Sequence, residues 1–409
     1  MKNQIAIFFV ILAASFVVIP VAGHQTCPGK KMERTGSCNV PGYANAALIN
    51  APGVDSVLVG GQNGTWFVPG QSPRLYAVYL QNDSAVHLSP VRSEGTVWGG
   101  GFNGSQFLIS GWGTDDASEG PYISLYDGAN VVAERSLDYY GEASSWSGGD
   151  VFAASYNGKE WLLSGLGSGP PPSYSANAKN HMSLGTFNGT VFTDLSNLVP
   201  NQHDAILYAN AWNGLYWLIG GGYLGYGRIF AFDGSRLVDL TTQAKQAIPS
   251  FASVQSIEWN GKYWLIGGIG FVAQYNGHNF VDLTQQLKTA VRTEKFYSVN
   301  AIAWNGQSWM IGGGTPVAQV TPSQAWIATY TSAGFVDLSP ALPLYISKAT
   351  QTSSILTITA ASESWIIGGY SGNQGTLFVY NGAYLTDYSS LVSDMTYVNW
   401  ASSLQDLVF

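Results

Sequence analysis

The chain has 409 residues, a net charge of −8 at neutral pH and only 10% charged side chains. Soluble proteins usually carry about 25% charged residues, so uncharged polar and aromatic side chains must supply much of this surface. Because the sequence has no run of Lys or Arg, its composition argues against nucleic acid as a partner.

The N-terminal segment, residues 1–23, has the layout of a secretory signal peptide. Lys2 precedes an apolar run over residues 5–19, and the small residues Ala22 and Gly23 follow. An uncleaved membrane anchor is the alternative, because this run approaches the length that spans a bilayer. Both interpretations predict that the rest of the chain is secreted or held at the cell surface. Contact with a membrane is then expected only through this segment, if it is retained.

The next segment, residues 24–41, contains the two cysteines of the chain, Cys27 and Cys38. In an exported protein, two cysteines this close in sequence predict one small-loop disulfide. The body that follows, residues 42–409, has no cysteine, which excludes thiol catalysis and cysteine-bound metal there.

A phrase such as NGKYWLIGG, an apolar strand followed by Gly-Gly or Ser-Gly, recurs seven times along this body. Its central residues are Val57, Phe107, Trp161, Trp217, Trp264, Trp309 and Trp365. Neighbouring copies lie 45 to 56 residues apart, a period typical of propeller arrays. We therefore expect the repeated tryptophans to be buried between repeats rather than to bind a ligand.

A second phrase follows each copy of the first, with an aromatic residue before Asn-Gly or Asp-Gly and an apolar run after it, as in QYNGHNFVDL. These dipeptides favour two-residue type I′ turns, so each repeat predicts two hairpins and four strands. A lone four-stranded sheet cannot bury both of its faces, whereas sheets stacked radially cover one another. The sequence therefore predicts an all-β fold, a seven-bladed β-propeller of four-stranded antiparallel blades. Eight blades are the alternative, and residues 395–409 are expected to close the ring.

The double glycines and the aromatic residue before the second turn resemble the kelch repeat. Gly-Gly occurs at residues 60–61, 220–221, 267–268, 312–313 and 368–369, and Ser-Gly at 110–111 and 164–165. The aromatic residues are Tyr126, Phe187, Phe232, Tyr275, Tyr330 and Tyr380. The resemblance covers residues 42–394 and implies the propeller fold, although the kelch tryptophan of the fourth strand is missing. It implies no single activity, and the Cys–Tyr cross-link of copper oxidases built on kelch-like propellers has no counterpart in this cysteine-free body.

Residues that repeat and residues that interrupt the repeat predict different roles. The Asp of each VDL-like phrase is expected to accept backbone N–H bonds within its own turn. These acids are Asp194, Asp239, Asp282, Asp337 and Asp387. Interruptions are better candidates for ligand binding, because loops on a rigid scaffold carry function. The aromatic candidates of this kind are Trp112, Tyr174, Tyr223 and Tyr226.

Acidic residues near the first strand of three consecutive repeats form a second candidate set, Glu94, Asp150 and Asp204, with His203 beside the last. If these strands line a central channel, the acids converge at its mouth and could bind Ca²⁺ or a hydroxylated ligand. Three solvated loop acids are the alternative.

Glu258 is a further candidate, because it stands at an inner-strand position where other repeats have Ala211, Ala303 or Ser155. Such an acid either lines the channel or pairs with another group.

Four Asn-x-Ser/Thr sequons are glycosylation candidates, at Asn63, Asn82, Asn103 and Asn188. The function that these features favour is a non-catalytic binding module for a carbohydrate or a protein. A secreted polysaccharide hydrolase or lyase with its site at the channel mouth is the alternative, as is a structural component of a cell envelope. No catalytic residue is assigned from the sequence, and Ca²⁺ is the one cofactor considered.

Overall fold

The computed structural model describes residues 46–51, 54–61, 74–79, 84–87, 94–114, 119–127, 131–137, 146, 149–167, 181–200, 205–223, 226–291, 298–314, 324–347, 353–361, 364–372 and 374–392. Segments 1–23, 24–41 and 395–409 lie outside these ranges, as do the candidates Cys27, Cys38, Asn63, Asn82, Tyr174, His203 and Asp204. Within the described ranges, no helix is both long and apolar enough to cross a membrane.

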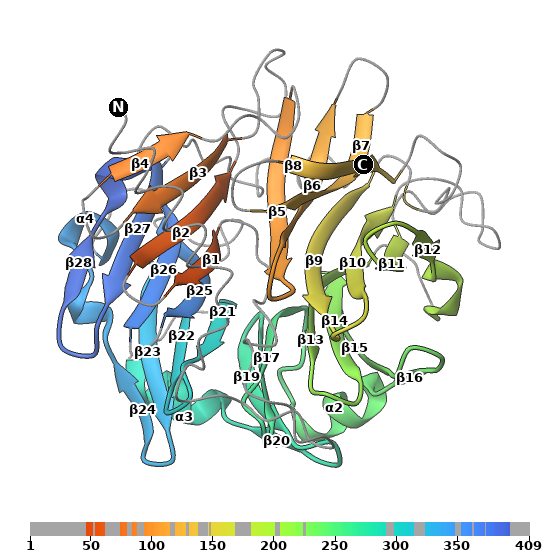
Figure 1. Cartoon of the computed structure of the whole chain (residues 1–409). Helices are drawn as coiled ribbons and strands as arrows, with labels where there is room; N and C mark the ends of the chain where they lie inside the picture. The colour runs from red at the N-terminus through yellow and green to blue at the C-terminus, as the bar shows by residue number, and fades with distance from the viewer. Residues whose placement is uncertain are drawn as a thin grey trace, which may run out of the picture.

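The described chain is built from four-stranded antiparallel sheets of consecutive strands, with the first strand nearest the middle of the molecule (Figure 1). The first strands are β1 (Ala46–Ala51), β5 (Glu94–Phe102), β9 (Asp150–Tyr156), β13 (Ile206–Trp212), β17 (Val254–Trp259), β21 (Ser298–Trp304) and β25 (Ser353–Ala361). The second strands are β2 (Val54–Gly61), β6 (Phe107–Thr114), β10 (Trp161–Gly167), β14 (Trp217–Tyr223), β18 (Trp264–Gly268), β22 (Trp309–Gly314) and β26 (Ser364–Ser371). The third strands are β3 (Arg74–Tyr79), β7 (Glu119–Tyr126), β11 (His181–Phe187), β15 (Tyr226–Phe232), β19 (Phe271–Tyr275), β23 (Trp326–Thr331) and β27 (Gln374–Tyr380). The fourth strands are β4 (Ser84–His87), β8 (Val131–Ser136), β12 (Phe192–Asp194), β16 (Leu237–Asp239), β20 (Phe280–Asp282), β24 (Gly334–Asp337) and β28 (Leu385–Asp387).

The sheets are arranged around a common axis as the blades of a β-propeller. Each first strand contacts the first strand of the next sheet from β1 through to β25, and β25 contacts β1 (Figure 1). Sheets β21–β24 and β25–β28 are also joined by one residue pair, Gly314 with Ser354. The predicted β-propeller is therefore confirmed, while the count of seven blades and the way in which the ring closes stay predictions.

The first hairpin of each repeat is present, but its turn differs from the predicted type. Trp259 pairs with Trp264, which leaves a four-residue loop in which Gly261 has a φ of 89°. The side-chain oxygen of Asn260 accepts the N–H groups of Lys262 and Tyr263 at 2.9 and 2.8 Å. Asn-Gly therefore does not supply the two central residues of a type I′ turn. Its Asn closes the loop with its side chain, and its Gly takes the positive φ.

The repeated Asp residues each close their own turn, as predicted. Asp282 accepts the backbone N–H of Thr284 at 2.8 Å, and the Thr284 hydroxyl accepts the N–H of Val272 in the third strand at 3.2 Å. The same two bonds recur in four other blades, at Asp194, Asp239, Asp337 and Asp387. Short helices follow these turns, of which α2 (Thr241–Ala247) and α3 (Thr284–Val291) are the longest. These acids are structural and are spread around the rim.

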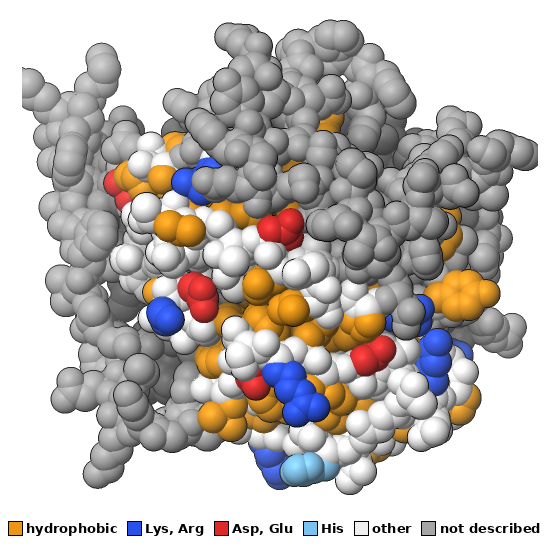
Figure 2. Space-filling view, turned by 90° about the vertical axis from the view of Figure 1, so that its right-hand side faces the viewer, with side chains coloured by type: hydrophobic (Ala, Val, Ile, Leu, Met, Phe, Trp, Pro, Cys, Tyr) orange, Lys and Arg blue, Asp and Glu red, His pale blue; other side chains and the backbone are white. Residues whose placement is uncertain are grey.

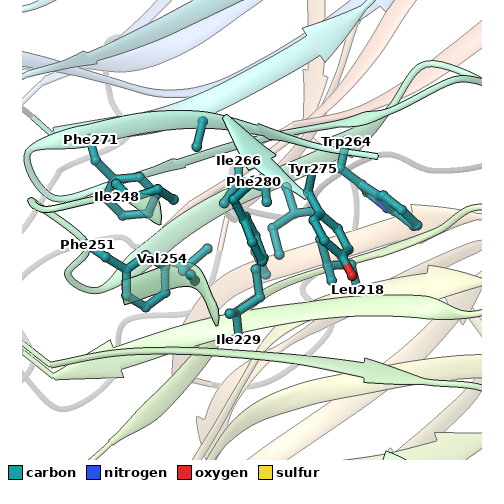
Figure 3. Close-up of a cluster of buried hydrophobic side chains, with 14 of the residues drawn as sticks. Leu218, Ile229, Ile248, Phe251, Val254, Trp264, Ile266, Phe271, Tyr275 and Phe280 are labelled. Carbon is teal, nitrogen blue, oxygen red and sulfur yellow. The ribbon is translucent and has the colours of Figure 1, made fainter. Parts of the chain in front are cut away.

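The repeated tryptophans form the core between blades. Trp161, Trp217, Trp264, Trp309 and Trp365 are all buried, which confirms their predicted role. Figure 3 shows one such seam, where Leu218 and Ile229 of one blade meet Trp264, Ile266 and Phe280 of the next. The double glycines allow this close approach. A Cβ atom on Gly220 would lie 2.4 Å from the Val254 side chain of the neighbouring blade.

Candidate functional site

Six of the first strands contain a β-bulge at the same register. In each, one residue is left out of the pairing with the second strand. The bulged residues are Trp98, Phe152, Tyr208, Gln255, Asn300 and Leu356. A bulge redirects a side chain away from the regular alternation of a strand. The strands that carry these residues lie nearest the middle of the molecule (Figure 1), so the six bulges occur on neighbouring inner strands.

Three bulged residues on consecutive blades are aromatic, and we call Trp98, Phe152 and Tyr208 the aromatic arc. The ring of Phe152 contacts both neighbours, with centroids 5.6 Å from Trp98 and 5.4 Å from Tyr208. Trp98 and Phe152 are buried and Tyr208 is partly exposed. The arc is therefore one continuous aromatic surface assembled from β5, β9 and β13.

The next two bulged residues are amides rather than aromatics. Gln255 donates to the hydroxyl of Ser253, and Asn300 donates to the Ser354 hydroxyl and the Ile355 carbonyl of the following blade. The bulged residue thus changes from aromatic to polar between β13 and β17.

Asp150 lies directly beside the aromatic arc. It is the first residue of β9, it is 3% exposed, and its carboxylate accepts the indole N–H of Trp98 at 2.7 Å. Burial raises the pKa of this carboxyl from 3.8 to about 7, and the Trp98 hydrogen bond opposes part of that rise. The alternative of a solvated loop acid is therefore wrong for Asp150.

Two of the aromatic candidates join Asp150 at this place. Trp112 packs against the cluster that contains Trp98 and Phe152. The pKa of the Tyr208 hydroxyl is raised by burial and further by the nearby Tyr223 and Asp150. Trp112 and Tyr223 are partly exposed. The structure thus places Trp112 against the cluster that contains Trp98, and Tyr223 near Tyr208, on the two blades that flank the blade of Asp150.

The other sequence candidates lie at the edge of this site or are not described. Tyr226 pairs across its hairpin with Tyr223 and is 69% exposed. Glu94 opens β5, in the same blade as Trp98. Among the described residues, no group of three His, Cys, Asp or Glu side chains is placed to hold a metal ion, and the Ca²⁺ site stays a prediction.

Glu258 belongs to a different place. It pairs with Leu265 as Ser155 pairs with Leu162, which confirms the sequence alignment of these two positions. Asp150 stands five residues before the Ser155 position, which corresponds to about 15 Å along a strand. The two buried acids therefore do not share a site.

The surroundings of Glu258 are apolar. It is 5% exposed, and its Oε2 has no hydrogen-bond partner in the described part of the chain. Its cross-strand neighbour Leu265 packs with Val299 and Ile302 of the next blade. Burial raises the pKa of this carboxyl well above its usual value, and the Trp259 backbone N–H opposes part of the rise. Glu258 is thus buried in a seam between blades.

The equivalent position in another seam shows how a polar group is satisfied there. The Ser155 hydroxyl donates to the side-chain oxygen of Asn210 in the next blade. The amide of Asn210 then donates to Ser164 at 2.7 Å. All three side chains are buried, so this seam carries a paired polar network where the Glu258 seam does not.

The sequons at Asn103 and Asn188 lie in hairpin turns, as predicted. The side-chain oxygen of Asn103 accepts the N–H groups of Ser105 and Gln106 at 2.9 and 2.8 Å. Asn188 makes the same two bonds in its own turn. Both asparagines therefore have a structural role, and their glycosylation stays a prediction.

Sequence reasoning missed the three residues of the aromatic arc, although a signal was present. Trp98, Phe152 and Tyr208 each lie five residues before the turn asparagine of their repeat. The same position is Gln255 and Asn300 in later repeats. An alignment of the first strands would have shown an aromatic residue at the same position in three consecutive repeats. The inward–outward alternation of side chains along a strand does not single out this position.

On the side of the molecule shown in Figure 2, the charges of the described residues are mixed. Figure 2 shows acidic and basic side chains interspersed among uncharged ones over the coloured part of this face, without a cluster of one sign. Exposed valines recur on the outer strands, at Val238, Val281 and Val336. They occupy the same register in three blades, which is a property of the repeat.

Comparison with known proteins gives similarity at the level of solved structures. No protein-family model and no curated protein matches the chain. The β-propeller domain of the Trilobed protease from Pyrococcus furiosus is similar, with 8% identity, a TM-score of 0.46, and coverage of 85% of this chain and 98% of that one. The Cps50 (Swd1) β-propeller domain of Myceliophteria thermophila has 11% identity, a TM-score of 0.47, and coverage of 81% and 95%.

An acylaminoacyl peptidase from Pyrococcus horikoshii is also similar, with 10% identity and a TM-score of 0.47 over 89% of this chain. The match covers 54% of that peptidase, so this chain spans about half its length. At these identities and scores, the similarities carry no inference about what this chain binds or does.

Proposed function

We propose that this chain is a non-catalytic binding module, an exported or cell-surface kelch-like β-propeller that holds a protein or a carbohydrate at the aromatic arc. One observation carries the proposal. A buried carboxyl, Asp150, adjoins an aromatic surface built from three blades, with the partly exposed Trp112 and Tyr223 beside it. Ligand sites combine mainly apolar and aromatic lining with a few fixed polar groups, and this place has that composition.

The position of these residues on strands favours binding. Each arc residue is held by the bulge of a first strand, and these strands pack against one another around the axis. Sites built on strands keep their geometry better than sites built on loops, so the arc is organised before a ligand arrives.

A polysaccharide hydrolase or lyase is the second candidate, because a carboxyl with a pKa of about 7 suits an acid catalyst. Glycoside cleavage needs two carboxyl groups roughly 5–10 Å apart. Among the described residues, the buried acids are Asp150 and Glu258, and they lie about 15 Å apart along the strand direction. These two acids therefore do not form a glycoside-cleaving pair.

The test is a binding screen with variants of the arc. The purified chain is applied to a glycan array and to a random peptide display library, and the selected ligands are measured by calorimetry. Tyr208→Ala and Tyr223→Ala are expected to weaken binding by about tenfold or more, as for central residues of other interfaces. Tyr384→Ala is the matched control, because Tyr384 is 65% exposed in a turn of a different blade. Ligands that bind all variants equally would refute the proposed place, and detectable hydrolysis of a bound glycan would favour the second candidate.

A further inference from the structure

The charge of Asp150 has no counter-ion among the described residues. The influences on its carboxyl are burial and the Trp98 indole, a neutral donor, and no described Lys, Arg or His contributes. An ionised carboxylate out of water is costly unless an opposite charge or several hydrogen bonds compensate it. With a pKa of about 7, this group ionises within the neutral range. A bound cation would remove the cost of the ionised form.

The rings around Asp150 favour the same kind of ligand. The face of an aromatic ring attracts a cation within about 6 Å, most strongly for Trp and Tyr. Trp98 is hydrogen-bonded to Asp150, Phe152 packs against Trp98, and Tyr208 is close enough for Asp150 to shift its pKa. Aromatic rings beside a carboxylate are a combination that binds alkylammonium and guanidinium groups.

We propose that the aromatic arc and Asp150 form a recognition site for one aliphatic cation, the ammonium or guanidinium group of a Lys or Arg side chain on a partner protein. This inference rests on the proposed binding function and specifies its ligand. The partly exposed side chains Trp112, Tyr208 and Tyr223 mark the side from which the cation arrives. The alkyl stem of the basic side chain packs on the rings, and its charged end reaches Asp150.

The charge of the whole chain supports a basic partner. Its net charge is −8, so a cationic surface is attracted at long range before specific contacts form. A neutral sugar would stack on the rings without stabilising the ionised form of Asp150, and an anionic ligand would be repelled by that form.

The experiment compares matched peptides in calorimetric titrations of the purified full-length chain. One Gly/Ser peptide carries a single central Arg, a second carries Lys, and a third carries citrulline, which has nearly the shape of Arg without the charge. Acetyl-arginine amide serves as the free small cation. The Arg and Lys peptides are expected to bind at least about tenfold more tightly than the citrulline peptide, because a desolvated cation–aromatic contact contributes enough binding free energy for that difference. Binding of the peptides well above that of acetyl-arginine amide supports a partner protein as the source.

Two variants locate the effect. Asp150→Asn keeps the shape and a hydrogen-bond acceptor for Trp98 but removes the charge, and it is expected to abolish most of the preference for Arg over citrulline. Glu258→Gln makes the same chemical change at a buried acid outside the site, and it is expected to leave the preference intact. Folding of both variants is checked by circular dichroism.

Each other outcome has a definite meaning. Equal binding of the Arg and citrulline peptides, or no binding of any probe, overturns the cation site. An unchanged preference in Asp150→Asn overturns it as well. Glycan binding that requires Tyr208 without any preference for cations overturns this inference and leaves the proposed binding function in place. If neither glycans nor displayed peptides bind, both fail.

Discussion

Replacing Asp150 by Asn is expected to remove a marked pH dependence of stability. The carboxyl has a pKa of 3.8 as its ordinary value and about 7 in the folded chain. Between these values the folded protein holds a proton that the unfolded chain releases. The contribution of Asp150 to the free energy of unfolding must therefore fall as the pH rises from about 4 to about 7, and then level off.

The size of this effect follows from the shift. Three pKa units at 1.36 kcal/mol each correspond to about 4 kcal/mol of stability lost over this range. Asn cannot ionise, and it retains an acceptor for the Trp98 indole. The stability of Asp150→Asn relative to the wild type should thus rise by about 4 kcal/mol between pH 4 and pH 7.5.

The assay is urea denaturation followed by tryptophan fluorescence, at half-unit steps of pH. The difference between variant and wild type isolates this one group, because all other titrating groups are common to both. Trp98→Phe provides a second check. It removes a hydrogen bond that lowers the pKa of Asp150, so its stability should continue to fall at pH values above 7.

A difference that stays constant from pH 4 to pH 8 would refute the reasoning, since Asp150 would then titrate at its ordinary value in the folded protein. A relative stability that declines with rising pH would refute it more strongly, because the folded state would then favour the ionised carboxylate.

Three further substitutions test other parts of the structure by the same denaturation assay. Glu258→Leu is expected to raise the free energy of unfolding at pH 7 by roughly 1–3 kcal/mol, since it removes a buried carboxyl whose Oε2 has no partner among the described residues, and a loss of stability would contradict the apolar seam. Gly267→Val is expected to lower the free energy of unfolding by roughly 1–3 kcal/mol, because its Cβ would lie 2.3 Å from Val299. An unchanged free energy of unfolding would contradict the close packing of these two blades. Thr284→Val leaves the Val272 N–H without its acceptor and is expected to cost about 1 kcal/mol, whereas Thr284→Ser should cost clearly less.

The fold could be predicted from the sequence because its signals repeat. The central residue stands three positions before the Gly-Gly or Ser-Gly in all seven copies, and it is Trp in five of them, so one misread copy does not change the conclusion. Hydrogen bonds between residues close in sequence were also predictable, as in the turn closed by the side chain of Asp282. The type of the hairpin turn was not predictable. The side chain of Asn260 accepts hydrogen bonds from residues two and three positions later, and the Asn-Gly dipeptide alone does not reveal this.

The site was predicted only in part. Trp112 and Tyr223 were recognised because they interrupt the repeat, and Asp150 because it is one of three acids near the first strands of consecutive repeats. Their proximity depends on how three blades pack, which spacing along the chain does not define. Phe152 was missed because strand alternation assumes a regular pleat, and a bulge breaks that rule at one residue. The burial of Glu258 was not predicted either, because it follows from contacts with the next blade.

Most strand positions must both pair with the neighbouring strand and carry a suitable side chain, and the shared bulge frees one position from the first requirement. A bulged residue does not pair with the second strand, so its identity can change without disturbing the hydrogen-bond ladder of its blade. Trp, Phe, Tyr, Gln, Asn and Leu all occupy this position in a single chain. Six blades therefore each offer one inner-strand position whose side chain can be exchanged without loss of a strand-pairing hydrogen bond, so specificity could be redesigned there one blade at a time.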